Sequence, residues 1–232
     1  MIRKLAIITA RGGSKRIPRK NIRNFLGKPI IAYSIESAIK SGVFDEIMVS
    51  TDDDEIAEIA EKFGAKVPFK RSEATSNDTA TTTDVIIEVL EEYKKHGQIF
   101  DYACCIYPTA PFIKPENLKT GLDKMIESKT EAAFPVVKYS YPVQRALEIG
   151  LDGRLTMLYP EHSRSRSQDL KAIFHDAGQF YWFKTSAITP DMELLKMKAS
   201  PIIVPETVVQ DIDTENDWIL AEMKYKFMEN HL

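Results

Sequence analysis

Short apolar segments alternate with amphipathic ones over residues 5–69, and this alternation constrains the fold more than any other feature of the chain. Consecutive apolar residues predict strands at 5–8, 47–50 and 65–69. Apolar residues at helical spacing predict a helix from Pro29 to Gly42 and another over 56–63. This order of strands and helices is typical of a parallel sheet that is covered by helices.

The alternation continues toward the C-terminus with one interruption, at about 139–175, where prolines and a hairpin turn at 152–153 replace it. We therefore expect a single α/β domain over 1–232, with a three-layer αβα architecture, a mostly parallel Rossmann-like sheet and one excursion. A stretch of this length is typical of a lid, an arm or a subunit contact, and a solvated loop is the alternative. The further expected elements are a helix capped by Thr83 or Asp84 and ending at Gly97, helices over 115–128 and after Thr214, and strands at 102–107, 132–137, 178–183 and 208–214.

Composition limits the class of protein. A net charge of −3 and a hydrophobic fraction of 44% are ordinary for a soluble protein with a full core. They indicate no general attraction to nucleic acid or to a membrane, and with no long apolar run or leader pattern we expect a cytoplasmic protein. Cys104 and Cys105 are adjacent in an apolar run, so they should point to opposite faces of a strand as buried thiols.

The segment after the first strand carries the strongest functional signal. Gly12 and Gly13 allow a close approach of the backbone to a ligand and expose consecutive N–H groups. Cationic side chains at 11, 15, 16, 19 and 20 would surround an anion, for which a triphosphate is the obvious candidate. A glycine pair is also compatible with a plain turn, and a charge run with a solvated face. The position after a first parallel strand favours a ligand site, although the loop matches neither a Walker nor a dinucleotide motif.

Two carboxylates near the C-terminus suggest a metal site. Asp211 and Asp213 would share one face of an extended strand, and paired carboxylates of this kind suit Mg²⁺ carried by phosphates. The alternative is that Asp213 only introduces the following helix while Asp211 is solvated. His175 and Asp176 are neighbours and cannot face each other on a strand, so no nucleophilic triad is expected.

Residues 10–21 resemble the A-R-x-x-S-K-x-x-x-x-K-N signature of the acylneuraminate cytidylyltransferases. Segments 49–52, 78–80, 108–111 and 211–214 occur in that family's order and spacing, so the resemblance covers essentially the whole chain. Segments 139–146, 166–170 and 174–183 are most similar to members that act on pseudaminic acid. The resemblance implies transfer of CMP from CTP to the anomeric hydroxyl of that acid, with Mg²⁺, in a homodimer that serves bacterial surface or flagellin glycosylation.

The resemblance also implies roles for individual residues. The expected catalytic group is Arg11, Lys20 and Asp211, and the expected metal ligands are Asp211 and Asp213. The residues expected to bind CTP are Ala10, Arg11, Gly12, Gly13, Ser14, Lys15, Lys20, Asn21, Arg71, Ala80 and Thr82. The residues expected to bind the sugar acid are Tyr107, Gln144, Arg166, His175, Gln179 and Tyr181.

Two positions depart from the pattern of the sialic acid members of the family. Tyr107 stands where those members carry Gln, and Ala177-Gly178 stands where they carry Asn-Gly. Both positions face the sugar in the family, so these departures favour an acid other than N-acetylneuraminate. The alternatives are a synthetase for CMP-N-acetylneuraminate or CMP-legionaminate, a sugar-1-phosphate nucleotidyltransferase, and a non-catalytic nucleotide-binding regulator, against which the paired carboxylates argue.

Overall fold

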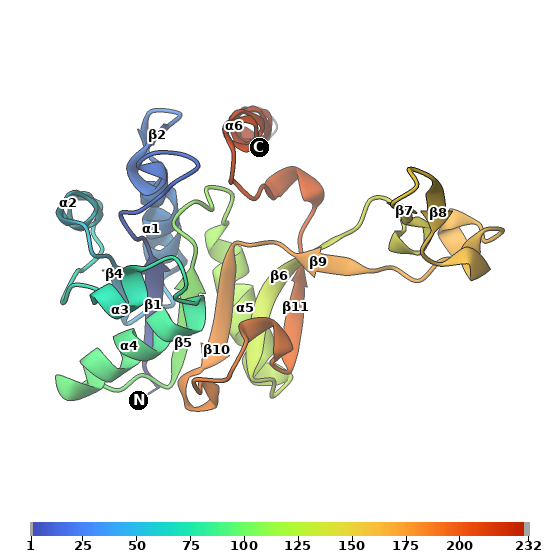
Figure 1. Cartoon of the computed structure of the whole chain (residues 1–232). Coiled ribbons are helices and arrows are strands. Elements are labelled where there is room, and N and C mark those ends of the chain that lie inside the picture. Colours follow the sequence, from blue (N-terminus) through green and yellow to red (C-terminus); the bar gives the residue numbers. More distant parts are fainter. Residues whose placement is uncertain (1, 230–232) are drawn as a thin grey trace.

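A computed structural model describes residues 2–229 of the chain, and a central sheet organises them (Figure 1). The order of its strands is β11-β6-β10-β5-β1-β4, with β9 paired to β6. The strands are β1 (Lys4–Thr9), β4 (Glu46–Ser50), β5 (Tyr102–Ile106), β6 (Ala132–Lys138), β9 (Phe174–Asp176), β10 (Phe180–Lys184) and β11 (Ala199–Ile203).

The directions of these strands correct one expectation. β1 runs parallel to β4 and β5, and β6 runs parallel to β11. β10 is antiparallel to both of its neighbours, β5 and β6, and β9 is antiparallel to β6. The sheet is therefore mixed rather than mostly parallel. The physical reason is that the segment between β6 and β10 re-enters the sheet at the end where β6 leaves it. The next strand therefore runs antiparallel to β6.

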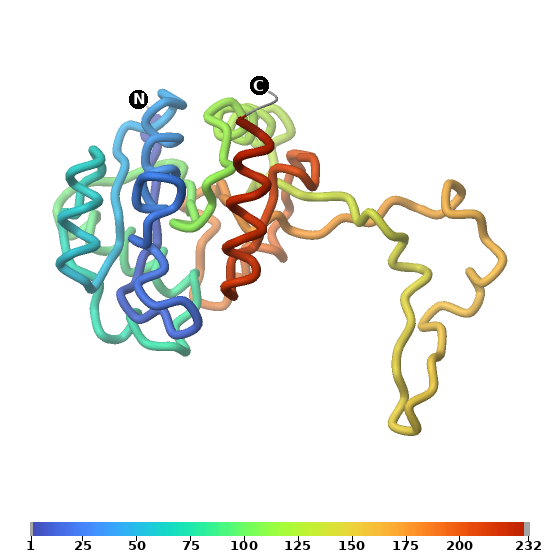
Figure 2. Tube along the Cα trace, turned by 90° about the horizontal axis from the view of Figure 1, so that it is seen from above, coloured from blue at the N-terminus to red at the C-terminus, as the bar shows by residue number. Residues whose placement is uncertain are grey.

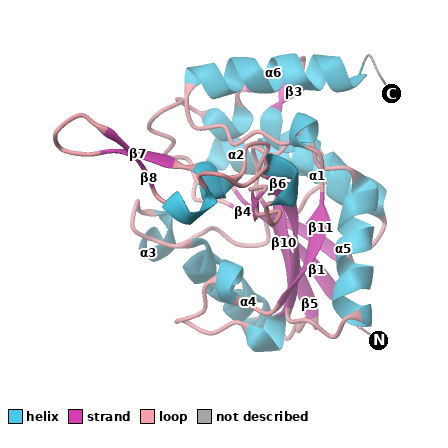
Figure 3. Cartoon of the chain, turned by 90° about the vertical axis from the view of Figure 1, so that its right-hand side faces the viewer, coloured by secondary structure: helices cyan, strands magenta, loops and turns pink. Residues whose placement is uncertain are grey.

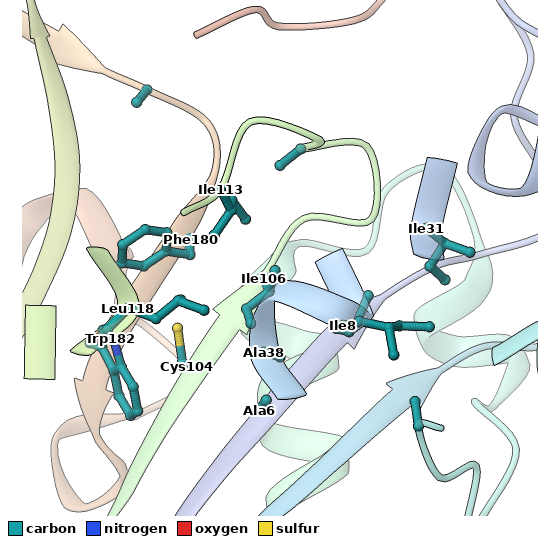
Figure 4. Packing of buried hydrophobic residues seen from close by; sticks show 14 of the residues in the cluster. Ala6, Ile8, Ile31, Ala38, Cys104, Ile106, Ile113, Leu118, Phe180 and Trp182 are labelled. Carbon is teal, nitrogen blue, oxygen red and sulfur yellow. Dashed lines mark hydrogen bonds between the residues drawn. The ribbon is translucent and has the colours of Figure 1, made fainter. Parts of the chain in front are cut away.

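Helices cover both faces of the sheet because β1 alternates its side chains between them. Ala6 and Ile8 pack with helices α1, α2 and α5 on one face, where Trp182 also lies (Figure 4). Leu5 and Ile7 pack with α4 on the opposite face. Cys104 and Cys105 lie on these opposite faces as free, buried thiols, as predicted. The helices are α1 (Ile30–Ser41), α2 (Asp54–Lys62), α3 (Glu73–Ser76), α4 (Thr82–Lys95), α5 (Pro115–Glu127) and α6 (Glu215–Glu229).

The helix α6 covers the end of the sheet toward which β1 and β5 run (Figure 3). Its Trp218 and Ala221 pack with Phe25 and Ile212 in a third buried cluster. Phe25 belongs to the short pair β2 (Asn24–Phe25) and β3 (Lys28–Pro29), which directly precedes α1. The C-terminal helix therefore joins the segment after β1 to the segment around Ile212.

Local sequence signals succeeded at some element ends and failed at others. Gly42 ends α1 in the left-handed region with φ 66°, as predicted. The expected strand at 65–69 is reduced to a single bridge between Met48 and Lys66. The cap of α4 is Thr81, which forms a capping box with Asp84, and not Thr83 or Asp84.

The expected last strand at 208–214 is wrong. Those residues form the end of a short 3₁₀ turn (Glu206–Val208) and then irregular backbone. The last strand is instead β11, which carries Pro201 and lies at the end of the strand order. A proline cannot donate a hydrogen bond to a neighbouring strand, so it is tolerated at an edge.

Residues 139–173, here called the arm, extend away from the sheet (Figures 1 and 2). The arm contains a two-stranded hairpin of β7 (Leu147–Ile149) and β8 (Leu155–Met157). Several of its apolar side chains are exposed, among them Tyr141 at 86% and Ile149 at 74%. Within residues 2–229, no helix has the length and apolar character that crossing a membrane requires.

Candidate active site

The loops that follow β1 and β5 border a cavity of about 510 Å³, here called the first cavity. Ala10, which follows β1, is buried and does not line this cavity, and its N–H donates to the carbonyl of Ser50 at 2.9 Å. Parallel strands bring these loops to one edge of the sheet, as expected for a ligand site of an α/β fold. The residues lining the first cavity are Thr9, Arg11, Ser14, Lys15, Arg16, Ile17, Lys20, Asn21, Tyr107, Pro108, Thr109, Asp211 and Asp213.

The loop of residues 11–20, here called the cationic loop, is shaped by the start of α2. A Cβ atom on Gly12 would lie 2.9 Å from Oδ2 of Asp53, so a larger residue does not fit without movement. The N–H of Gly12 donates to Oδ1 of Asp52 at 2.8 Å. The glycine is therefore required by a close approach within the chain. Its N–H is engaged there and is not presented to a ligand, which differs from the expectation.

The cations of the loop are held by carboxylates from distant segments. Arg11 donates to Oδ1 of Asp78 at 2.9 Å, and Lys15 pairs with the other oxygen of the same carboxylate. Lys20 donates from Nζ to the carbonyl of Ile212 at 2.6 Å. Three cationic side chains that line the first cavity are thus fixed by residues that follow them by more than sixty positions.

Arg19 differs from the expected ring of cations. Its guanidinium forms a bidentate pair with Asp53, with Nη2 and Oδ1 3.0 Å apart, and also pairs with Glu55. The Arg19 guanidinium holds the pKa of Asp53 down, to about 2. Arg19 thus ties the cationic loop to α2 and does not line the first cavity.

Asp211 and Asp213 both line the first cavity, although neither lies on a strand. Asp211 is open to solvent on one side, yet desolvation at the cavity wall and then the charge of Asp213 raise its pKa. Asp213 pairs with Arg16 at 2.7 Å, and Nζ of Lys20 lies 3.5 Å away. No group of three or more His, Cys, Asp or Glu ligands occurs among residues 2–229. Two mutually repelling carboxylates fit a Mg²⁺ ion that takes its other ligands from phosphate and water.

A second cavity of about 520 Å³ shares Tyr107 and Asp211 with the first. His175 and Asp176 lie on its wall at the end of β9. Lys224 of α6 also lines it and donates to the carbonyl of Val209 at 2.7 Å. The remaining lining residues are Val137, Ala177, Gly178, Glu206, Val209 and Gln210.

Several predicted nucleotide residues make structural contacts. Arg71 is buried, and its guanidinium donates to the hydroxyl and the carbonyl of Ser50 at 3.0 and 2.7 Å. Burial lowers its pKa. Asn21 is buried and donates to the carbonyl of Arg11 at 2.9 Å, so it supports the cationic loop. The N–H of Ala80 donates to Oδ1 of Asn77 at 2.9 Å.

The predicted sugar-acid residues fall into three places. Tyr107 and His175 line the second cavity, whereas Tyr181 lines a smaller cavity that Tyr107 also borders. Thr82, which is predicted to bind CTP, lines this smaller cavity and not the first. Gln179 is buried and donates to the carbonyl of Val208 at 2.7 Å. Tyr107, His175, Gln179 and Tyr181 therefore lie around the place where the first and second cavities meet, at Tyr107.

Gln144 and Arg166 lie on the arm, in a separate cavity with Arg164 and Lys171. Oε1 of Gln144 is buried without a partner, and its amide donates to the carbonyl of Lys171 at 2.9 Å. Arg166 donates to Asp169 at 2.7 Å. One chain alone does not bring these two residues to the first or second cavity.

Sequence reasoning missed three residues that the cavities bring into view. Asp176 enters the sequence pattern as the neighbour of His175 and as part of segment 174–183, without a role of its own, although it directly precedes the turn into β10. Asp78 was read only as part of a motif, and its pairing with the cationic loop depends on tertiary structure. No sequence signal could have identified Lys224, which is one of two lysines along α6.

Comparison with known proteins gives consistent results. A profile of the cytidylyltransferase family matches residues 5–215. A pseudaminic acid cytidylyltransferase of Campylobacter jejuni is 44% identical over 225 residues, which cover 97% of each chain. A CMP-N,N'-diacetyllegionaminic acid synthase of Legionella pneumophila is 32% identical over 98% of this chain and 97% of its own. The structure of CMP:2-keto-3-deoxy-manno-octonic acid synthetase complexed with CTP superposes with a TM-score of 0.70 at 19% identity, covering 99% of this chain and 100% of its own.

Proposed function

We propose, from the premise that this chain belongs to the cytidylyltransferase family, that it transfers CMP from CTP to the anomeric hydroxyl of pseudaminic acid and releases pyrophosphate. The observation that carries this proposal is the junction of the two cavities. The first cavity is lined by four Arg and Lys side chains and the second by one lysine, Lys224, and both are bordered by Tyr107 and Asp211. Two substrates in these cavities would meet at that shared wall.

The first cavity suits a nucleoside triphosphate. Arg11, Lys15 and Lys20 supply positive charge around its wall, and Ser14 supplies a hydroxyl. In nucleotidyl transfer the protein mainly positions the reacting groups and stabilises charge that develops at phosphorus. The sugar hydroxyl forms a bond to the α-phosphorus and loses its proton, while the bond from that phosphorus to pyrophosphate breaks. Lys20 is assigned to the α-phosphate, because its ammonium lines the first cavity beside Asp213, one of the two carboxylates assigned to the metal.

Asp211 and Asp213 are assigned to Mg²⁺, because their carboxylates line the same cavity as the cations. When bound there, the ion would neutralise phosphate charge and increase the acidity of a bound hydroxyl. Arg16 pairs with Oδ1 of Asp213, so this guanidinium would compete with a metal for that carboxylate.

A panel of acceptors tests the proposed substrate. Purified protein is given CTP, Mg²⁺ and one acceptor, which is pseudaminic, N,N'-diacetyllegionaminic or N-acetylneuraminic acid, or a sugar-1-phosphate. Pyrophosphate release is measured together with mass detection of the nucleotide sugar. We expect pseudaminic acid to give the highest kcat/KM. Preference for either other acid would contradict the proposed specificity, and activity only with sugar-1-phosphates would contradict the reaction class.

A matched pair of lysine variants tests the assigned site. Lys20→Ala should lower kcat at least about 100-fold, because a cation at the reacting phosphate stabilises charge in the transition state. Lys40→Ala is the control, since Lys40 pairs with Glu36 on the exposed surface of α1. Equal rate constants for the two variants would remove Lys20 from the mechanism.

We further propose that the arm docks on a second copy of the chain to form a homodimer. The exposed apolar side chains of the arm support this, because a solvated arm has no physical reason to carry Tyr141, Leu151 and Ile149 at its surface. In this arrangement Arg166 and Gln144 act at the second cavity of the partner. Light scattering in solution measures the dimer directly, and a monomer at micromolar concentration would contradict it.

Mixing two inactive variants tests whether the site is shared. Lys20→Ala damages the body and Arg166→Ala damages the arm, so a mixed dimer contains one intact site. Random mixing in a symmetric dimer restores about a quarter of the wild-type activity. A mixture that stays as inactive as its components would show that each chain uses its own arm or none.

A further inference from the structure

Asp176 is fixed in position by two donors from its own chain. It ends β9, opposite Val136 in the sheet. Its Oδ1 accepts the N–H of Gly178 at 3.1 Å, and its Oδ2 accepts the hydroxyl of Tyr181. Each carboxylate oxygen has two acceptor sites, so acceptor capacity remains after these two bonds. The side chain is partly buried and lines the second cavity, where that capacity is available to a ligand.

A buried tyrosine, Tyr181, and a partly buried one, Tyr107, support this carboxylate. The ring of Tyr181 packs against that of Tyr107, with centroids 5.4 Å apart. Burial raises the pKa of both phenols, so both hydroxyls keep their protons at neutral pH and act as donors. Tyr107 also interacts with Thr82, on the other side of the junction. Asp176, Tyr181 and Tyr107 therefore form one connected polar wall of the second cavity, in which ring packing and the hydrogen bond from Tyr181 hold the carboxylate in place.

The charge of the second cavity determines which part of a sugar acid this wall can face. Asp176, Glu206 and Asp211 all line the cavity. The ammonium of Lys224 donates to the carbonyls of Val209 and Glu206, at 2.7 and 3.4 Å. Asp176 and Glu206 still outnumber the one ammonium of Lys224 when Asp211 is engaged by a metal, so the carboxylate of the substrate is disfavoured beside Asp176. The groups left to face Asp176 are the neutral hydroxyl and amide N–H donors.

We propose that Asp176 is a specificity-determining residue that accepts a hydrogen bond from an N–H or O–H group of the sugar acid. This rests on the proposed function, in which the second cavity receives that acid. An isomer that places no donor there leaves the remaining acceptor sites of this partly buried carboxylate unpaired. Sites that hydrogen-bond a substrate group reject analogues that lack it more strongly than apolar pockets do.

Two variants separate recognition from structural support. Asp176→Asn keeps the size of the side chain but replaces one acceptor oxygen with an NH₂ donor. Tyr181→Phe removes the hydroxyl that holds Oδ2 and keeps the carboxylate. Titration calorimetry with CTP checks that each variant is folded, because CTP is assigned to the first cavity. The rate readout is kcat/KM for pseudaminic, N,N'-diacetyllegionaminic and N-acetylneuraminic acids.

We expect Asp176→Asn to lower kcat/KM for the preferred acid about 10- to 100-fold and to change the ratios among the three acids. Tyr181→Phe should cost less and largely preserve those ratios. The inference is overturned if Asp176→Asn lowers all three acids by one factor, or if the two variants have the same effect. Failure of the proposed function is separate, because it would appear as wild-type protein that releases no pyrophosphate with any of the acids.

Discussion

Asp53 gives the most direct test of how the cationic loop is held. Its Oδ1 accepts the N–H of Ile56 as the N-cap of α2, and the same carboxylate pairs with Arg19. Asp53→Asn keeps the cap, since Asn and Asp are equivalent there, but removes the charge. A carboxyl whose pKa falls from 3.8 to about 2 contributes up to about 2.5 kcal/mol at neutral pH. The Arg19 side chain is 40% exposed, so solvent screening reduces the expected loss to about 1 kcal/mol.

The pH dependence has a definite sign. Because the folded pKa lies below the unfolded one, the contribution is complete above about pH 5 and is lost as the pH falls through about 4 toward 2. Urea unfolding followed by tryptophan fluorescence measures it, since Trp182 and Trp218 are both buried. The difference in free energy of unfolding between wild type and Asp53→Asn should be constant from about pH 7 to about 5 and should shrink toward about pH 3.

The neighbouring residue provides the control. Asp54 pairs with Lys70, but its side chain is 94% exposed. Asp54→Asn should change the free energy of unfolding by less than about 0.5 kcal/mol at any pH. A gap between wild type and Asp53→Asn that stays the same at about pH 3 as at about pH 7 would refute the ion-pair reasoning. So would equal effects of the two substitutions.

Three further outcomes follow from the contacts described above. Gly121→Ala should lower Tm, because the new Cβ would lie 2.9 Å from Cδ1 of Trp182. The overpacking costs about 1–3 kcal/mol, which exceeds the roughly 1 kcal/mol gained in helix propensity. A higher Tm in scanning calorimetry would contradict this. Asp78→Asn should tighten CTP binding about 2- to 5-fold in titration calorimetry, because the carboxylate competes for Arg11, and weaker binding would show that Asp78 assists the nucleotide. Chelation should abolish pyrophosphate release, and added Mg²⁺ should restore it. Asp211→Asn should need a higher Mg²⁺ concentration than wild type to reach half of its maximal rate. Full activity in the presence of chelator would remove the metal assignment.

The parts of the fold that could be predicted depend on neighbours in sequence. Gly42 ends α1 and the apolar run of β1 forms a buried strand, since turn geometry and hydrophobic periodicity are local. β11 was missed because Pro201 argues against a strand unless the strand lies at an edge, and only the sheet order reveals the edge. Residues 208–214 are rich in β-branched side chains, yet they are bound by distant donors such as Gln179 and Lys224 instead of a neighbouring strand.

The candidate site shows the same division. The cationic loop was recognisable because its glycines and cations are contiguous. Its internal pairing with Asp78 and Asp53 was not, because those carboxylates lie far along the chain and reach the loop only through the fold. Arg19 shows the consequence, since its charge suggested a phosphate ligand and its position makes it a tie to α2. Charge can be read from sequence, but the partner of a charge cannot.

The reversed direction of β10 also bears on how such a chain can diversify. β10 lies between β5 and β6 and is antiparallel to both. The connection from β6 to β10 therefore leaves and re-enters the sheet at the same end of the strands. A connection of any length satisfies that geometry, and doubling its length adds only about 0.6 kcal/mol of closure entropy. The arm can therefore be lengthened, shortened or replaced between relatives while the β1–β4–β5 half stays unchanged. In such a lineage the contacts made by the arm would change, while the residues that line the first cavity would be retained.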